Sequence, residues 1–471
     1  MEAIFINPLP KAVGSNDATV EPPLGLAYLA SSLEQQGFKC SIIDAKTLGL
    51  GSEEVMSQIS SQHSLIGFYL NSFNYDTVLE LTQLCRRKQP DATIVLGGPL
   101  ASAAPEMVLS DFPCHGIVRG EGEDAVVGIM HNLATGRPPF DREIPGAAYY
   151  DDSKNMVMNP VVRIMDLDRL PYPAYHLLPP LNTYKSRSRK RPFAAIITSR
   201  GCSYDCIFCS KDIFQRKVAF RSPANVLAEI DYMVNNYGVR GLDILDDNFA
   251  QNRTRMEEIL EGIVQRNYNL SINLQTGIRS EIIDEKLLSL MKRAGIYSLA
   301  FGIESADPEV LRICRKKLDL IKLEEVVKLA KKMGFLVHSF FIIGLPGETE
   351  ESFRNTLDFA RRLKLDVANI CMAIPFPGTE LFNMVKEKGR FLIDTTHKID
   401  TGFYGGKVFF EYNNSRQEDT LRRYQIAYKE FYSIRKKLQL ILSIRSLSEV
   451  IWYWDAAKFV LKGLFTKAQK N

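Results

Sequence analysis

Short uninterrupted runs of apolar residues alternate with amphipathic segments along most of this chain. In the first 150 residues, apolar runs predict β-strands, and segments with helical spacing between them predict α-helices. The strands are expected at 3–6, 39–43, 65–69, 93–96 and 116–118, and the helices at 25–36, 76–88 and 105–110. Strands that are apolar at every position are typical of a parallel sheet buried on both faces. The pattern therefore predicts an α/β domain with a doubly wound parallel sheet of the Rossmann or flavodoxin type.

A second alternating series begins at residue 193. It predicts strands at 194–198, 241–245, 271–275, 297–301, 336–343 and 367–372. Helical patterns follow these strands at 223–237, 253–267, 284–294, 308–314 with 323–333, 349–363 and 380–388. Polar residues gather where the apolar strands stop. In barrel enzymes these carboxyl ends of the strands carry the chemistry.

Two further regions complete the predicted organisation. Residues 151–192 contain prolines at 171, 173, 179 and 180, which forbid a long helix and predict an extended, packed connector. The basic run at 185–192 is expected to be a solvated loop, with a contact to an anionic substrate or a membrane as the alternative. We therefore divide the chain into a first domain (1–150), a connector (151–192), a second domain (193–390) and a basic, aromatic, helical C-terminal region (391–471).

Charge is distributed unevenly along the 471 residues. The net charge is +4, but residues 421–471 alone carry eleven Lys or Arg against three Asp or Glu. The two main domains thus present no broad basic face, which argues against a nucleic-acid-binding protein. Residues 421–471, the tail, are expected to form helices that pack over the second domain. The less favoured alternative is an amphipathic element on a membrane surface.

No secretory signal and no apolar run of about 18 residues is apparent, so we expect a cytoplasmic protein. Of the eight cysteines, five are scattered without a spacing pattern and are expected to be free thiols. These are Cys40, Cys85, Cys114, Cys314 and Cys371.

The other three cysteines, Cys202, Cys206 and Cys209, lie on one short loop after the apolar strand at 194–198. Thiolates bind soft iron or zinc, and structural sites use four protein ligands. A C-x3-C-x2-C loop can ligate three irons of a four-iron cluster and leave one iron open for a reacting ligand. The alternative, a zinc knuckle, needs a fourth ligand nearby, yet His176 and His338 are distant in sequence.

At this loop the chain resembles the radical S-adenosylmethionine (SAM) superfamily, which has this spacing with an aromatic residue, here Phe208, before the last cysteine. The resemblance implies a [4Fe–4S] cluster whose open iron is chelated by SAM. One electron from the cluster would cleave SAM to a 5′-deoxyadenosyl radical. The six strand–helix units likewise resemble the partial (β/α)6 barrel, of the TIM type, of these enzymes.

The resemblance also implies which residues contact SAM. Asp246 and Asp247 match the position that contacts the methionine amino group, and Gln275 and Arg279 follow the next strand. The remaining implied contacts are Phe208, Gly302, Glu304, Ser305, Gly344 and Pro375. Two alternatives remain for single residues. Asp247 can serve as a helix cap or turn residue, and Arg279 can pair with Glu281 or Asp284.

The first domain resembles the cobalamin-binding domain that precedes the barrel in one class of these enzymes. The resemblance rests on the Gly97-Gly98-Pro99 turn and on the helix start at 23–30. Paired glycines let backbone approach a bulky ligand. The implied cobalamin contacts at the strand ends are Asn7, Ser72, Gly97, Gly98, Pro99 and Glu121. The Asp-x-His-x-x-Gly lower-ligand motif is absent, so the alternative is a flavodoxin-like module without a corrin.

Together these features predict a radical SAM enzyme, with cobalamin-dependent methylation or rearrangement at an unactivated carbon as the leading hypothesis. Cobalamin would then deliver a methyl group to a substrate radical. The first alternative is a cobalamin-independent dehydratase, dehydrogenase or cyclase, and the second is a non-catalytic iron–sulfur carrier or sensor. The expected partners are a small-molecule or natural-product substrate and an electron donor such as flavodoxin or ferredoxin, without nucleic acid.

Overall fold

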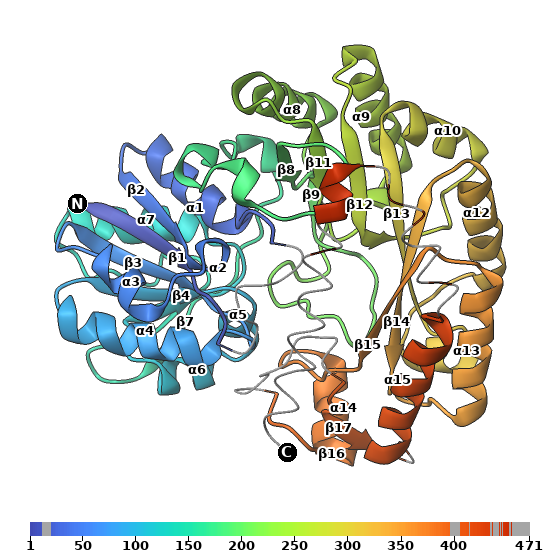
Figure 1. Cartoon of the computed structure of the whole chain (residues 1–471). Helices are drawn as coiled ribbons and strands as arrows, with labels where there is room; N and C mark the ends of the chain where they lie inside the picture. The colour runs from blue at the N-terminus through green and yellow to red at the C-terminus, as the bar shows by residue number, and fades with distance from the viewer. Residues whose placement is uncertain are drawn as a thin grey trace.

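Two α/β domains lie side by side in the computed structural model (Figure 1). The structure describes residues 1–11, 20–395, 406–413, 415–433, 436, 442, 444, 446–451 and 454. Much of the C-terminal region from 434 onward, on which part of the tail prediction falls, lies outside the described residues.

The first domain is built on a seven-stranded sheet of order β2-β1-β3-β4-β5-β6-β7. Its strands are β1 (Glu2–Asn7), β2 (Lys39–Asp44), β3 (His63–Tyr69), β4 (Thr93–Gly97), β5 (Gly116–Val118), β6 (Ala147–Tyr150) and β7 (Met156–Met158). The first five are parallel, as the sequence predicted, whereas β6 and β7 add antiparallel. These two short strands were not predicted, and they continue the sheet beyond the expected boundary at residue 150.

Helices cover both faces of this sheet. They are α1 (Leu24–Gln35), α2 (Ala45–Leu48), α3 (Ser52–Ser57), α4 (Tyr75–Lys88), α5 (Pro99–Ala103), α6 (Pro105–Asp111) and α7 (Glu123–Ala134). Ile4 and Ile6 of β1 join a core with residues of α3, α4 and α6, while Ala3 and Phe5 join the opposite core with residues of α1 and α7. Burial on both faces explains why apolar residues follow one another along the middle of these strands without alternation.

The second domain contains a six-stranded, fully parallel sheet of order β15-β14-β13-β12-β11-β8. Its strands are β8 (Phe193–Ile196), β11 (Gly241–Ile244), β12 (Ser271–Ile278), β13 (Ile296–Glu304), β14 (Leu336–Ile343) and β15 (Val367–Met372). Each strand pairs with the next one along the chain, which confirms the predicted partial (β/α)6 barrel. A two-residue pair, β9 (Ser199–Arg200) and β10 (Ala219–Phe220), closes the base of the loop that carries the three cysteines.

Helices line the outer side of this sheet (Figure 1). They are α8 (Pro223–Tyr237), α9 (Arg253–Arg266), α10 (Glu285–Arg293), α12 (Leu320–Lys332) and α13 (Glu350–Arg362), and the domain also contains α11 (Pro308–Ile313) and α14 (Glu380–Lys388). After α14, the hairpin of β16 (Gly389–Phe391) and β17 (Phe410–Tyr412) leads to α15 (Gln417–Phe431). No helix in the described part of the chain has the length and apolar character needed to cross a membrane.

The connector contains three short 3-10 helices, η1 (Leu167–Arg169), η2 (Tyr175–Leu177) and η3 (Leu181–Thr183), and no α-helix, as its prolines predicted. Its basic run is not the solvated loop that we expected. Ser186, Arg187 and Ser188 are buried. The Ser186 hydroxyl donates to Asp243 of β11, and Arg187 Nη1 lies 3.0 Å from His338 Nε2 of β14. The buried Arg187 thus contacts a side chain of β14, far away in the sequence. The local sequence gave no sign of this contact.

Candidate functional site

The loop of three cysteines is held at its start by two carboxylates that follow β11. The backbone N–H of Thr198 donates to Asp246 Oδ1 at 2.6 Å, and the hydroxyls of Thr198 and Ser199 donate to Asp246 Oδ2 at 2.5 and 2.6 Å. The N–H of Gly201 donates to Asp247 Oδ2 at 2.8 Å. Residues 198–201 thus form a fixed segment that leads directly into Cys202.

The structure places Asp246 away from solvent. Its side chain is completely buried and its two oxygens accept three hydrogen bonds from Thr198 and Ser199, which favours a structural role over the predicted contact with the SAM amino group. Burial raises the pKa of Asp246. Asp247 has an exposed side chain and stays a candidate ligand, with one oxygen already bonded to Gly201.

The three thiols lie on the loop between β9 and β10. Cys206 is buried, Cys202 is half-buried and Cys209 is exposed. The N–H of Cys209 donates to the carbonyl oxygen of Cys206 at 3.2 Å. A hydrogen bond from the Cys209 thiol lowers the pKa of Cys206 to about 6. Within the described residues, no group of three or more His, Cys, Asp or Glu side chains is gathered for a single metal ion.

The donor set nevertheless fits an iron–sulfur cluster, because three soft sulfur donors share one short loop with a buried cation beside them. Lys316 provides this cation. Its ammonium group pairs with Glu304 Oε1 at 2.9 Å, and the two side chains are 10% and 9% exposed. The same ammonium adds to the lowering of the pKa of Cys206, after the larger effect of the Cys209 thiol.

Backbone geometry around β13 makes room for the Lys316–Glu304 pair. Glu304 ends the strand with a φ of 65°, and a side-chain carbon added at Gly302 would lie 2.8 Å from both Glu304 Oε1 and Lys316 Nζ. Sequence analysis singled out Gly302 and Glu304 but missed Lys316. No local pattern distinguishes Lys316 from Arg315 and Lys317, which are both exposed.

Arg279 holds the backbone of Lys316 in place and does not point into solvent. Its Nη1 donates to the carbonyl oxygen of Lys316 at 2.8 Å, and its guanidinium stacks 3.9 Å from the centre of the Tyr204 ring. Arg279 also pairs with Glu281 at 3.0 Å, the alternative left open by the sequence. Asp284 pairs instead with Arg253. Arg279 is therefore a link between the cysteine loop and Lys316.

Gln275 lies within β12, not at its end as predicted. Its amide donates to Glu21 Oε1 and, at 3.3 Å, to Asp243 Oδ2. Burial raises the pKa of Glu21 to about 8, and the nearby Asp243 carboxylate adds to this effect. Gln275 therefore sits in a buried polar cluster inside the barrel, which argues against a direct role beside SAM.

Four other predicted contacts have mixed outcomes. Ser305 is buried and its hydroxyl accepts from the N–H of Asp307, so it shapes the turn before α11. The carbonyl oxygen of Pro375 accepts from Thr395 Oγ1 at 2.7 Å. Phe208 is half-buried against the barrel core, and Gly344 faces α15. Of these four, only Phe208 keeps a partly exposed side chain next to the thiols.

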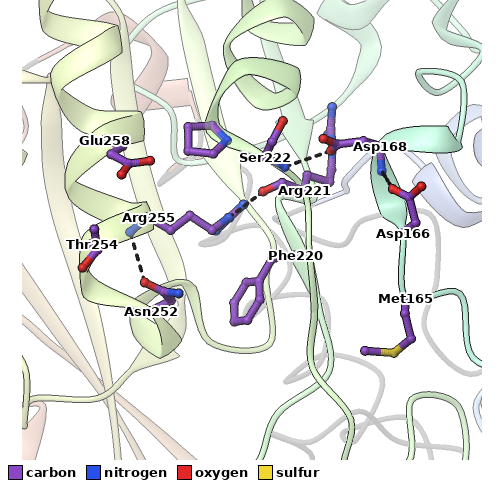
Figure 2. Close-up of a pocket in the computed structure, with 11 residues that line it drawn as sticks. Met165, Asp166, Asp168, Phe220, Arg221, Ser222, Asn252, Thr254, Arg255 and Glu258 are labelled. Atoms are coloured by element: carbon purple, nitrogen blue, oxygen red, sulfur yellow. Dashed lines mark hydrogen bonds between the residues drawn. The ribbon is translucent and has the colours of Figure 1, made fainter.

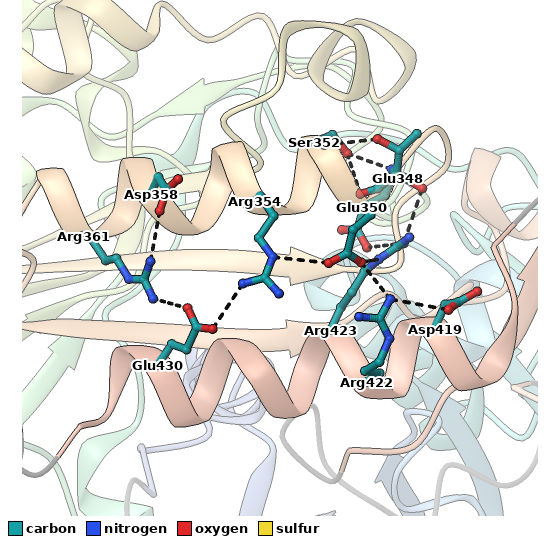
Figure 3. Close-up of polar contacts among 11 residues, drawn as sticks. Glu348, Glu350, Ser352, Arg354, Asp358, Arg361, Asp419, Arg422, Arg423 and Glu430 are labelled. Carbon is teal, nitrogen blue, oxygen red and sulfur yellow. Dashed lines mark hydrogen bonds and ion pairs between the residues drawn. The ribbon is translucent and has the colours of Figure 1, made fainter.

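Helix α15 packs along β14 and β15, with its start near the carboxyl end of β14 and Tyr432 beside Ala368 near the start of β15. This arrangement favours the packing interpretation for this part of the tail. A side-chain carbon at Gly344 would lie 2.8 Å from Thr420 Cγ2. Arg423 Nη1 lies 3.3 Å from Glu348 Oε1, and Glu348 Oε1 also accepts from the N–H of Gly344 at 3.2 Å. Figure 3 shows this pair beside an exposed lattice of charges that joins α13 to α15. α15 therefore belongs to the wall of the site.

Burial raises the pKa of Glu348 to about 7, against the opposing effect of Arg423. Because the folded state then holds a proton that the unfolded state has already released, Glu348 should make stability fall as pH rises from about 4.5 to about 7. We expect the difference in unfolding free energy between wild type and Glu348→Gln to change by about 3 kcal/mol across this window. Urea denaturation at several pH values measures it. Glu351→Gln, at an exposed neighbouring position, should show no such change.

The strand ends of the first domain form the candidate cobalamin site. Gly98 has a φ of 112°, and an added side-chain carbon would lie 2.7 Å from the carbonyl oxygen of Leu70. At Gly97, by contrast, the only neighbour within 4 Å among the described residues is the carbonyl oxygen of Val118 at 3.7 Å. Gly97 thus leaves open space at the end of β4, and Pro99 begins α5 beside it. This space fits the close approach of a large planar ligand.

Two of the other predicted cobalamin contacts are engaged by the protein. Asn7 Nδ2 donates to Asp44 Oδ1 at 2.8 Å, and both side chains are buried. Both oxygens of Glu121 accept from arginines, so the structure assigns Glu121 a different role. Ser72 is buried at the end of β3 and stays a candidate.

The two glycines should respond differently to alanine. Gly98→Ala is expected to destabilise the protein by roughly 2–4 kcal/mol, because both the positive φ and the Leu70 carbonyl oppose a side chain. Gly97→Ala should leave stability within about 0.5 kcal/mol yet weaken corrin retention, since the methyl group fills the open space. Urea denaturation and the corrin absorbance of purified protein measure the two effects. Equal destabilisation by both variants would contradict this account.

A separate cavity of about 430 Å³ lies between the starts of α8 and α9 and the connector (Figure 2). Its lining includes the helix caps Ser222 and Asn252 and the buried Arg255, but no residue that the sequence predicted for a cofactor. Arg255 donates to the carbonyl oxygens of Arg221 and Thr198, at 2.7 and 2.5 Å. The cavity therefore backs onto the segment before the cysteines without containing the cofactor residues.

Comparison with known proteins identifies two families along the chain. Residues 196–360 match the radical SAM superfamily, and residues 10–130 match the B12 binding domain. An uncharacterized methyltransferase of Pyrococcus horikoshii is 31% identical over 382 residues, which cover 80% of this chain and 82% of that protein. The chain belongs to the radical SAM enzymes that carry an N-terminal cobalamin-binding domain. The predicted [4Fe–4S] cluster, SAM and cobalamin are the cofactors of this class.

Other relatives have different named activities. The anaerobic magnesium-protoporphyrin IX monomethyl ester cyclase of Rubrivivax gelatinosus is 29% identical over 82% of this chain and 70% of its own. Among solved structures, the methyltransferase TsrM of Kitasatospora setae, with cobalamin and a [4Fe–4S] cluster bound, superposes with a TM-score of 0.70 at 18% identity, covering 99% of this chain and all of that chain. The cobalamin-dependent radical enzyme OxsB gives 0.74 at 16% identity, covering 99% and 72%. These similarities confirm the fold.

Proposed function

We propose that this protein is a cobalamin-dependent radical SAM methyltransferase that methylates an unactivated carbon of a small-molecule substrate. The observation that carries the proposal is a direct contact between the two cofactor regions. Arg200, which precedes the cysteine loop, donates to Glu121 at the strand ends of the cobalamin-binding domain at 2.8 Å. The loop and the strand ends are thus held together. The methyltransferase named in Pyrococcus horikoshii supports the same reaction class.

Each part of the chain has a role in this proposal. When bound, the cluster with SAM supplies a 5′-deoxyadenosyl radical and cobalamin supplies a methyl group. Cys202, Cys206 and Cys209 hold the cluster, and Lys316 meets the SAM carboxylate. Gly97 lets the corrin approach the backbone. Helix α15 closes the side of the barrel at β14 and β15, which helps to exclude water. A flavodoxin or ferredoxin would reduce the cluster.

A second candidate is radical cyclisation without methyl transfer, which the similarity to the Rubrivivax gelatinosus cyclase favours. The cysteine loop and the Lys316–Glu304 pair would serve it equally well. In this case the first domain need not supply a methyl group from cobalamin, because the adenosyl radical would act on the substrate directly. A non-catalytic iron–sulfur carrier is the remaining alternative, and it would not cleave SAM.

The test is to purify the protein without oxygen from cobalamin-supplemented cells, reconstitute the cluster and add SAM with a reductant. Near-stoichiometric corrin absorbance, with formation of both 5′-deoxyadenosine and S-adenosylhomocysteine, is expected. S-adenosylhomocysteine is what remains of SAM after its methyl group leaves. Formation of 5′-deoxyadenosine alone, without corrin, would favour cyclisation. Loss of all SAM cleavage under these conditions would contradict an enzymatic role. Protein from cobalamin-free cells is the control.

A further inference from the structure

Four buried charges join the two domains immediately before the first cysteine. Arg200 Nη1 donates to Glu121 Oε1 at 2.8 Å, and Arg200 Nη2 lies 2.7 Å from Glu123 Oε1. On the other side, Arg163 of the connector and the N–H of Ile164, the latter at 2.8 Å, donate to Glu121 Oε2. Glu121 therefore bridges the barrel and the connector from the end of β5.

This network is closed to solvent. The side chains of Glu121, Arg163, Glu123 and Arg200 are 1%, 2%, 5% and 7% exposed, and their formal charges cancel. The Arg200 guanidinium also lies 4.8 Å from the centre of the Tyr28 ring. Removal of one partner from such a group leaves an uncompensated buried charge, which is strongly unfavourable. Replacement of any one of these four side chains should therefore disturb the contact between the two domains.

The residues before Cys202 alternate between the two domains. Ser199 donates to Asp246, and Gly201 donates to Asp247, both in the barrel. Arg200, between them, turns to the opposite side and reaches Glu121. The backbone that enters the cysteine loop is thus fastened on both sides. A change at Glu121 is transmitted to Cys202 through only two residues.

We propose that Glu121 is a positioning residue that sets the cysteine loop against the cobalamin-binding strand ends, and that it acts through Arg200. This inference rests on the proposed function. It differs from the sequence prediction, in which Glu121 contacts cobalamin itself. A loosened loop still makes the radical but delivers it less often to a substrate held beside the corrin. Loss of Glu121 therefore uncouples SAM cleavage from methyl transfer.

The test compares Glu121→Gln with wild type and with Glu34→Gln as the matched control. Glu34 lies in the same domain and also contacts the connector, through an exposed pair with His176 at 2.9 Å. The first readout is hydrogen–deuterium exchange of amides 199–209 in the anaerobic, cluster-loaded protein. We expect exchange there to be at least about tenfold faster in Glu121→Gln and unchanged in Glu34→Gln.

The second readout is the ratio of 5′-deoxyadenosine to S-adenosylhomocysteine, which should rise severalfold in Glu121→Gln at wild-type iron content. Arg200→Lys keeps one bond to Glu121 and should give an intermediate ratio, which provides a second variant if Glu121→Gln does not fold. Unchanged exchange, or a proportional fall of both products, would overturn the proposal. If wild type forms neither product, the proposed function fails, while the exchange experiment still tests the contact.

Discussion

Replacement of Cys202, Cys206 and Cys209 by alanine is expected to abolish iron binding and SAM cleavage together. The three thiols are the soft donors on the loop that follows β8, and Lys316 cannot replace them because an ammonium group has no lone pair to donate to iron. Iron analysis after anaerobic reconstitution and assay of 5′-deoxyadenosine measure the two losses. Both should fall to the background of protein-free controls.

The control for this variant removes the same number of thiols elsewhere. Cys40, Cys114 and Cys371 are half-buried, like Cys202, and lie outside the loop. Their triple replacement by alanine should leave iron content and SAM cleavage close to wild type. The first domain of the loop variant should unfold at the wild-type urea concentration, since its two cores contain none of the three thiols. Retained SAM cleavage in the loop variant would refute the assignment of the cluster.

Lys316→Gln is expected to have two separate effects. It leaves Glu304 buried without its cation, which should destabilise the fold by roughly 3–5 kcal/mol. It also removes the cation proposed to meet the SAM carboxylate, which should weaken SAM binding by about 10- to 100-fold, as for loss of a charge-assisted hydrogen bond. Urea denaturation measures the first effect, and anaerobic equilibrium dialysis of SAM measures the second.

Two variants separate these effects. Lys317→Gln makes the same change at the exposed adjacent residue and should alter neither stability nor SAM binding. The double variant Glu304→Gln with Lys316→Met removes both buried charges and should recover most of the lost stability without recovering SAM affinity. If the double variant binds SAM as tightly as wild type, Lys316 has only a structural role.

The sequence predicted the strands well because each carries its own signal. Ile4 and Phe5 point to opposite cores, so residues 3–6 of β1 are all apolar, and the middles of the other central strands are apolar for the same reason. The cysteine loop could be predicted equally well, since its three sulfur donors lie within eight residues. Both features depend on residues close together in the chain, so a single sequence is enough to recognise them. The antiparallel strands β6 and β7, of four and three residues, were missed although both are short apolar runs.

Contacts between distant segments were not predictable in this way. The sequence marked Asp246 and Glu121 as polar residues at strand ends, which is correct, but it could not show that Thr198 and Arg200 already occupy their oxygens. Lys316 was missed for the opposite reason. It lies among other basic residues, and only the fold buries it beside Glu304. The partner of a charge is a property of the folded chain.

The buried run of the connector has a consequence for how this enzyme can be divided. Ser186 and Arg187 occupy the inside of the barrel, against Asp243 and His338. A protein cut at residue 192 would leave Asp243 without its contact to Ser186 and His338 without its contact to Arg187. Residue 192 therefore separates the connector from the barrel in the sequence but not in the folded structure. Fragments meant to isolate the barrel should begin before residue 184, and exchange of first domains between relatives should carry the connector along with the barrel that it fills.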